Sequence, residues 1–369
     1  MAYKLAISSM SLGRCFAGHT LERKLDLARQ YGYRGIELFH EDLADVARRL
    51  FGSTDAEQQL QAAALIRTMC RARGLEVICL QPFMHYEGLV DRAEHARRLD
   101  ELALWLRLAG CLGTDLVQIP SSFLPADRVS DDVGLIVADL RAAADLAAAA
   151  DPPVRLVYES LAWGTRVDTW EACWDVARAV DRPNFGICLD TFNIAARIYA
   201  DPTVPGGVAG PDAADAVRQS LERLLERVDV ARVFYVQVVD AERLRVPLGP
   251  GHAFHVDGQP PRMSWSRNCR LFYGEEDRGA YLPVREIAAA IFHGLGFEGW
   301  VSLELFNRRM SDEDPAVPEE LARRGAASWV KLVQDLGLKV ETEAVAASSA
   351  SESMSILLRA ENSRELLAT

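Results

Sequence analysis

The sequence lacks any long hydrophobic segment. No stretch of its 369 residues reaches the roughly 18 consecutive apolar residues that a membrane-spanning helix requires. Residues 1–7 also lack the basic and then apolar pattern of a secretory signal. Hydrophobic residues make up 49% and charged residues 25%, which is the balance of a globular protein with a large core. We therefore expect a folded protein that does not associate with a membrane.

An excess of basic residues is also missing. The 41 Lys and Arg residues are outnumbered by 53 Asp and Glu residues, which gives a net charge of −12. Because an acidic surface repels phosphate groups, we expect neither nucleic acid nor an anionic membrane as a partner. A small basic pocket for an anionic metabolite is compatible with this balance. The sequence leaves open whether copies of the chain form a homo-oligomer.

Paired cysteines are absent as well. The seven cysteines are Cys15, Cys70, Cys79, Cys111, Cys173, Cys188 and Cys269. They are scattered and form no Cys-x-x-Cys pair, which is typical of a protein in a reducing compartment. We therefore expect buried, unpaired thiols and a cytoplasmic location.

The chain does contain short apolar runs that alternate with longer segments of helical period. The runs are Lys4–Ser9, Gly35–Phe39, Glu76–Gln81, Asp115–Pro120, Val154–Glu159, Phe185–Asp190, Val233–Val238 and Trp300–Leu305. The helical segments are Leu21–Tyr31, Ala56–Arg73, Arg92–Leu112, Val133–Ala149, Thr169–Val180, Ala214–Val228 and Val284–Leu295. Apolar strands separated by helices predict a parallel sheet that is covered by helices.

Eight such units favour a closed barrel over an open doubly wound sheet. The open sheet would call for a glycine-rich phosphate turn after the first strand, and residues 8–13 do not supply one. We therefore predict an α/β fold, a (β/α)8 TIM barrel, as the catalytic domain over residues 1–340. A long loop, Asp240–Leu282, follows the seventh strand. Residues 341–369 are expected to be a C-terminal tail, partly disordered or a short helix.

Oxygen-bearing side chains end four consecutive predicted strands. They are Glu159, Asp190, Gln237 and Glu304. In a barrel of this type the carboxyl ends of the strands meet at one mouth, so we expect these side chains to converge there. Three carboxylates in one place require a cation to neutralise them, and a set of oxygen ligands favours Mg²⁺, Mn²⁺ or a similar divalent ion. A single rim carboxylate held by a neighbouring arginine is the alternative for any one of them.

Further polar residues lie at the same predicted mouth. Glu37 and Gln81 lie at strand ends, His85 follows the third strand, and Asn193 follows the sixth. The long loop carries Arg267 in an unusual setting, together with His252, His255 and Arg270. An arginine fork suits the capture of a carboxylate or phosphate, and a plain loop salt bridge is the alternative.

These residues resemble a known family. The strand-end ligands are similar to those of the xylose-isomerase-like superfamily, and four strings resemble the fungal-type 3-dehydroshikimate dehydratases of quinate catabolism. The strings are GIELFHEDL at 35–43, QPFMHYEG at 81–88, LDTFN at 189–193 and SWSRNCRLFYGE at 264–275. The resemblance covers about residues 3–340 and implies a TIM barrel that converts 3-dehydroshikimate to protocatechuate (3,4-dihydroxybenzoate).

The resemblance also implies roles for individual residues. Glu159, Asp190, Gln237 and Glu304 match the family's ligands for a divalent metal ion (Mg, Mn or Co). Arg267 matches the loop arginine that holds the substrate carboxylate, with Asn193 and Gln81 as further substrate-binding candidates.

The predicted acid–base residues depart from the bacterial pattern of the family. Met84 and Asn193 stand where that pattern has Arg and His. The candidates for the base are Glu304 and Glu37, and the candidates for the acid are His85 and a metal-bound water.

Three other functions would keep the barrel but change what it does. A sugar isomerase or epimerase of the same superfamily would transfer a proton through an enediol and form no aromatic product. A non-catalytic binding protein would not need ligands on all four strands. A metal-dependent endonuclease is disfavoured, because the chain has only seven histidines and a net charge of −12.

Overall fold

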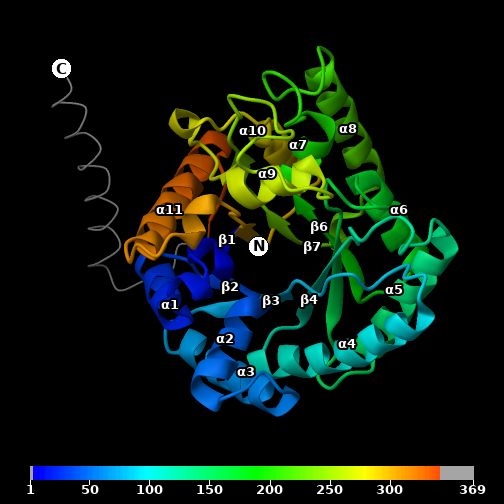
Figure 1. Ribbon diagram of the computed structural model, residues 1–369, viewed down its shortest axis with the longest axis vertical. Helices are drawn as coiled ribbons and strands as arrows, with labels where there is room; N and C mark the ends of the chain where they lie inside the picture. Colours follow the sequence, from blue (N-terminus) through cyan, green and yellow to red (C-terminus); the bar gives the residue numbers. More distant parts are fainter. Residues whose placement is uncertain (1–2, 341–369) are drawn as a thin grey trace.

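Eight parallel strands close into a barrel within residues 3–340, the part of the chain that this computed structural model describes (Figure 1). The strands are β1 (Lys4–Ser8), β2 (Gly35–Phe39), β3 (Glu76–Gln81), β4 (Leu116–Pro120), β5 (Arg155–Glu159), β6 (Phe185–Asp190), β7 (Val233–Gln237) and β10 (Trp300–Leu303). Neighbours in the barrel follow the chain order, and β10 pairs with β1 to close it. The predicted α/β barrel is confirmed, and every strand lies within two residues of its predicted bounds.

A ring of helices surrounds the strands (Figure 1). The predicted segments form α1 (Leu21–Gln30), α3 (Ala56–Arg71), α4 (Arg92–Leu112), α5 (Val133–Ala148), α6 (Trp170–Val180), α8 (Ala213–Arg227) and α10 (Val284–Ala289). A π-helical turn, η5 (Ala290–Gly294), continues α10. The helical period of the apolar residues therefore predicts most of the helices in this outer layer correctly.

Within the described residues, four helices lie outside the predicted segments. They are α2 (His40–Phe51), α7 (Thr191–Ile198), α9 (Pro261–Cys269) and α11 (Val317–Leu336). Both α2 and α7 begin at the residue that follows a strand, so no turn residues mark their start. In α9 the residues 263–266 are buried in succession, so apolar and polar residues share the buried positions and the sequence shows no clear amphipathic period.

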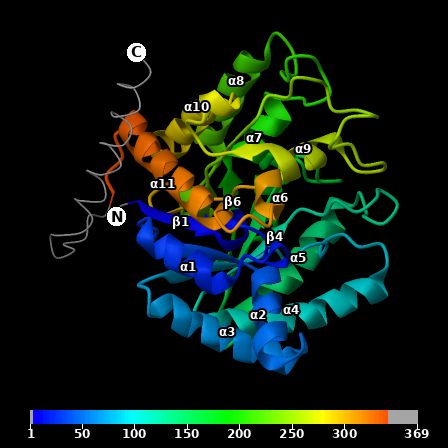
Figure 2. The ribbon, with the colours of Figure 1, turned by 60° about the vertical axis from the view of Figure 1, so that its left-hand side comes forward.

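The long segment after β7 is more ordered than the predicted loop. It contains α9 and a short antiparallel pair, β8 (Asp240–Ala241) and β9 (Arg270–Leu271). Figure 2 shows α9 beside α7, and the Phe192 and Trp265 rings of these helices lie 5.1 Å apart. The antiparallel pair and the aromatic contact hold this segment against the strand ends.

The seven cysteines all lie within residues 3–340, and none forms a disulfide there. Five of them are buried, and burial raises the pKa of Cys70 and of Cys269 to about 12. The expectation of buried, unpaired thiols is therefore confirmed for these five, whereas Cys15 and Cys111 are unpaired but only half-buried. No helix in the described part of the chain is long and apolar enough to cross a bilayer. The predicted tail, 341–369, lies outside the described residues.

A buried carboxyl group links the loops that follow β3 and β4. Oε1 of Glu87 accepts hydrogen bonds from the Ser122 backbone N–H at 2.6 Å and from the Tyr158 hydroxyl at 3.0 Å. Its Oε2 has no hydrogen-bond partner within residues 3–340. Burial raises the pKa of Glu87 to about 7, so ionising this group opposes folding.

We predict that Glu87→Gln stabilises the protein at alkaline pH. As the pH rises from about 4.5 to about 7, the unfolded carboxyl ionises while the folded one keeps its proton, so the wild-type stability falls across this window. Glutamine keeps the acceptor oxygen and cannot ionise. Urea unfolding should show a small difference at pH 5 and a gain of at most about 3 kcal/mol at pH 8.

The exposed Glu313 offers a matched control, because Glu313→Gln removes a carboxylate that is already in water. It should change the free energy of unfolding by less than about 0.5 kcal/mol at either pH. A Glu87→Gln protein that is less stable than the wild type at pH 8 would contradict the assignment.

Candidate active site

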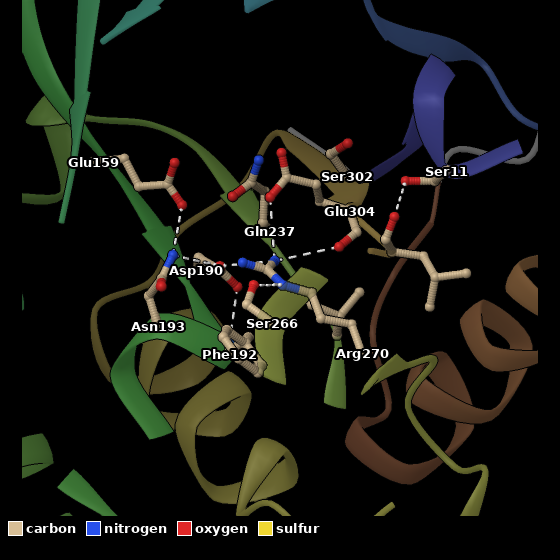
Figure 3. A network of polar contacts seen from close by, with 12 residues as sticks. Ser11, Glu159, Asp190, Phe192, Asn193, Gln237, Ser266, Arg270, Ser302 and Glu304 are labelled. Carbon is tan, nitrogen blue, oxygen red and sulfur yellow. Dashed lines mark hydrogen bonds and ion pairs between the residues drawn. The ribbon is translucent and has the colours of Figure 1, made fainter. Parts of the chain in front are cut away.

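Three carboxyl groups meet at the mouth of the barrel. Glu159 ends β5, Asp190 ends β6, and Glu304 directly follows β10. One oxygen from each lies within 4.8 Å of the others, and each residue is at most 3% exposed. Figure 3 shows that the three side chains come from separate strands and point toward one another. The structure thus brings together the carboxylates that the sequence predicts to converge.

Gln237 lies between these carboxylates in the barrel. It ends β7, which pairs with β6 at Asp190 and with β10 at Ser302. Its Nε2 donates to Glu37 Oε1 at 2.8 Å. Its Oε1 is buried and has no hydrogen-bond partner within residues 3–340. A buried oxygen without a donor is costly unless something else binds it, so this atom fits a cation ligand.

A buried arginine partly balances the three carboxylates. Nη1 of Arg270, on β9, lies 3.1 Å from Asp190 Oδ2 and 3.1 Å from Glu304 Oε2 (Figure 3). Its guanidinium packs against the rings of Phe192 and Phe306, at 4.2 and 4.9 Å from their centroids. The side chain is 1% exposed. Three carboxylates and one guanidinium leave two negative charges, which a divalent cation would neutralise.

The pKa values express the same crowding of negative charge. Burial raises the pKa of Glu159 well above its usual range, and the neighbouring carboxylates raise it further. Burial raises the pKa of Glu304 to about 8, although Arg270 opposes this shift. The pKa of Asp190 is also raised by burial. In the absence of a cation, burial and mutual repulsion therefore favour the protonated forms of these acids.

Asn193 contacts two of these carboxylates. It lies in the first turn of α7, whose N-cap is Asp190. Its amide nitrogen donates to Glu159 Oε1 at 2.9 Å and to Asp190 Oδ2 at 2.7 Å. Its amide oxygen accepts from the Ala162 backbone N–H at 3.0 Å. These contacts connect the ends of β5 and β6.

Two glutamines at strand ends donate to the same group of acids. Gln81, which ends β3, donates to Glu304 Oε1 at 2.9 Å. Gln118 on β4 donates to Glu159 Oε2 at 2.6 Å. Its place near the end of a predicted strand already makes Gln118 a polar candidate at the barrel mouth, but the sequence assigns it no role. Neutral amides thus contribute hydrogen bonds without adding charge.

Glu37 lies deeper in the barrel than the other acids. It is fully buried, and burial raises its pKa to about 7. Its two oxygens accept hydrogen bonds from the Tyr235 hydroxyl at 2.6 Å, from Gln237 at 2.8 Å and from the Ser302 hydroxyl at 2.6 Å.

His85 occupies a strained position after β3. Its backbone φ of 57° is in the left-handed region, and its ring meets the Phe123 ring edge-on at 4.3 Å. Its buried Nδ1 has no partner in the part of the chain that the structure describes. Burial lowers the pKa of His85 to about 4, and the charges of Arg98, Arg128 and Arg267 lower it further in the same direction. Its imidazole is therefore neutral near pH 7.

Arg267 lies at the surface near His85 rather than among the acids. It is exposed, and its Nη1 donates to Gln259 Oε1 at 3.0 Å. Among the described residues, the arginine that pairs with the carboxylates is Arg270, three positions further on. Both arginines belong to the same sequence string, so only the folded backbone distinguishes their places.

A cavity of about 310 Å³ opens beside His85, on the side of β3 and α4. Its lining residues are His40, Pro82, Met84, His85, Leu89, Glu94, Arg98, Glu101, Trp105, Leu124 and Arg128. The three strand-end carboxylates do not line it. His85 thus lies at its edge, and two of the arginines that act on His85 form part of its wall.

Comparisons with known proteins agree with this architecture. The model of the xylose isomerase-like TIM barrel family matches residues 25–332. A 3-dehydroshikimate dehydratase from Neurospora crassa is 66% identical over 347 residues, which cover 92% of this chain and 96% of that protein. A 3-dehydroshikimate dehydratase from Pseudomonas aeruginosa is 29% identical over 288 residues, which cover 78% of this chain and 36% of that longer protein.

A solved structure shows the same fold. It is a xylose isomerase-like TIM barrel/4-hydroxyphenylpyruvate dioxygenase fusion protein, with a TM-score of 0.67 and 26% identity. The match covers 91% of this chain and 44% of that one. The chain therefore belongs to the xylose isomerase-like TIM barrel family, and within it to the group of the fungal 3-dehydroshikimate dehydratase.

Proposed function

We propose that this protein is a metal-dependent 3-dehydroshikimate dehydratase, a hydro-lyase that removes water from 3-dehydroshikimate to give protocatechuate. The observation that carries the proposal is the cluster of three buried carboxyl groups at the strand ends, with an unpartnered amide oxygen beside it. This cluster occurs in a chain that is 66% identical, over 92% of its length, to a protein named 3-dehydroshikimate dehydratase. A role in quinate and shikimate catabolism in the cytoplasm follows from this activity, and the seven unpaired thiols within residues 3–340 are compatible with it.

Four residues would hold the metal ion. They are Glu159, Asp190, Gln237 and Glu304. All four donors are oxygens, which favours Mg²⁺, Mn²⁺ or Co²⁺ over softer ions. When bound, the ion would supply Lewis-acid stabilisation of the negative charge that develops on a substrate oxygen.

The substrate carboxylate is held by arginine. The positive charges of Arg267, Arg98 and Arg128 act on His85, whose pKa is lowered first by burial and further by these arginines. A guanidinium binds a carboxylate through two parallel hydrogen bonds. We assign Arg267 as the main contact, because within residues 3–340 its Nη1 has only a neutral partner, Gln259. Asn193 and Gln81 act on the substrate through the carboxylates that they orient.

Proton transfer requires a base and an acid. Glu304 is the proposed base that takes the proton next to the ketone, because it is one of the carboxylates that meet at the barrel mouth. The electrons of that C–H bond form the new double bond as the hydroxyl leaves. His85 delivers a proton to this hydroxyl, so that water departs. A bound substrate carboxylate would offset the arginine charges and raise the pKa of His85 toward the value that this step needs. One further ring C–H then loses its proton while the ketone oxygen takes up a proton, and this tautomerisation completes the aromatic ring.

The direct test is a metal-dependent activity assay. Purified protein loaded with Mg²⁺, Mn²⁺ or Co²⁺ should convert 3-dehydroshikimate to a product with the ultraviolet absorbance of protocatechuate. EDTA should abolish the signal, and adding the metal back should restore it. Folded, metal-loaded protein that forms no aromatic product but interconverts ketoses would replace the dehydratase with a sugar isomerase or epimerase.

The metal ligands predict a joint loss of metal and activity. Glu159→Ala and Asp190→Ala each remove a charged ligand, so both variants should lose turnover by more than about 100-fold and retain no metal after gel filtration. Elemental analysis by mass spectrometry measures the metal, and circular dichroism verifies folding. A metal-free variant that remains active would refute the metal site.

The two arginines of the segment after β7 should respond differently to the same substitution. Arg270→Met removes the counter-charge of two buried carboxyl groups, so we expect a loss of about 3 kcal/mol in the stability of the metal-free protein at pH 8. Arg267→Met removes only a surface contact to substrate. It should leave the melting temperature within about 2 °C and raise KM by about 10- to 100-fold. Equal effects of the two variants on stability would contradict the assignment.

A further inference from the structure

The amide of Gln237 has two orientations with opposite consequences. The oxygen and the nitrogen of a side-chain amide are nearly the same size, but only the oxygen binds a cation. A half-turn of the amide would direct its N–H groups toward the three carboxylates instead of its oxygen. A neighbouring group must therefore select one orientation if Gln237 is to act as a metal ligand.

Glu37, on β2, is the group that contacts this amide. Its Oε1 accepts a hydrogen bond from Gln237 Nε2 at 2.8 Å. A carboxylate oxygen offers no N–H to the amide, so it favours the nitrogen of Gln237 over its oxygen at this position. With the nitrogen held, Gln237 Oε1 is buried and has no hydrogen-bond partner among residues 3–340.

Two hydroxyl groups hold Glu37 in turn. Tyr235 donates to Oε1 at 2.6 Å, and Ser302 donates to Oε2 at 2.6 Å. Tyr235 lies two residues before Gln237, and Ser302 lies two residues before Glu304. Because side chains alternate along a strand, both hydroxyls belong to the layer of the barrel below the proposed ligands. Glu37 therefore bridges this lower layer and the ligand layer.

We propose that Glu37 is a positioning residue that holds the Gln237 amide with its oxygen toward the cation and thereby sets the affinity of the site for metal. This inference rests on the proposed metal-dependent function. It gives Glu37 a role other than that of proton acceptor. Three donors already occupy its two oxygens, and its side chain has no exposed surface for a substrate to meet.

The test compares two substitutions of Glu37 by their dissociation constants for Mn²⁺, measured by calorimetry or by electron paramagnetic resonance. Glu37→Gln keeps an acceptor oxygen for Gln237, and its new amide nitrogen faces the Ser302 hydroxyl, which can accept. Glu37→Leu removes the acceptor. We expect Glu37→Gln to stay within about 5-fold of the wild-type Kd and to keep at least about a third of kcat, whereas Glu37→Leu weakens Mn²⁺ binding about 10- to 100-fold.

Two controls separate positioning from a general effect on packing. Tyr235→Phe removes another hydrogen bond to the same Glu37 oxygen without touching Gln237, so its Kd for Mn²⁺ should stay within about 3-fold of the wild type. In a Gln237→Leu background, Glu37→Leu should weaken Mn²⁺ binding no further, because its effect acts only through the amide.

Several outcomes would overturn the proposal. One is an unchanged Kd for Mn²⁺ in Glu37→Leu. Another is that Glu37→Leu weakens Mn²⁺ binding equally in the wild-type and in the Gln237→Leu background. A Glu37→Gln protein that binds Mn²⁺ normally but loses kcat would make Glu37 a proton-transfer group instead. If Glu37→Leu does not fold, Glu37→Gln decides alone. A Glu37→Gln protein that keeps both its affinity for Mn²⁺ and its kcat supports positioning, and loss of either the affinity or kcat overturns it. A wild-type protein that binds no Mn²⁺ would refute the proposed function itself, before any variant is compared.

Discussion

Concentrated negative charge at the carboxyl ends of the strands is the constraint on which the rest of the site depends. Three buried carboxyl groups lie within 4.8 Å of one another, where mutual repulsion and loss of water both oppose ionisation. Arg270 supplies one positive charge at this point, and it reaches the acids because β9 pairs with β8 above the barrel. Rings on either side shield its guanidinium from water. The two negative charges that remain are equal in number and opposite in sign to the charge of a divalent cation.

Amide side chains, rather than further charges, complete the hydrogen bonding of these acids. Gln81, Gln118 and Asn193 each donate to a carboxylate, and Gln237 donates to Glu37 beneath. A lysine or arginine in any of these places would bring the charge of the site closer to zero and weaken its attraction for a cation. The amides come from strand ends and from the first turn of a helix, so their positions are fixed by rigid elements. The orientation of each acid is therefore determined before any ligand arrives.

The barrel fold and its strand-end acids could be predicted from the sequence because both follow local patterns. Apolar runs indicate the strands, and a polar residue at the end of each run must lie at the mouth. The same reasoning could not choose between Arg267 and Arg270, because the choice depends on how a segment of over forty residues folds back on the barrel. The contacts of Asn193 could not be predicted either. Helix α7 starts directly after Asp190 and turns the Asn193 amide toward two carboxylates, and no residue pattern specifies this direction.

The arrangement of charge also explains how one orientation of the proposed substrate is selected. The chain carries a net charge of −12, yet Arg98, Arg128 and Arg267 create a positive region around His85. In the proposed function, a substrate with a carboxylate at one end would be attracted to these arginines. Its ketone and hydroxyl groups would then be directed to the strand-end carboxylates, where a cation would lie. The arginine charges would thus orient the proposed substrate before any hydrogen bond to the reacting atoms forms.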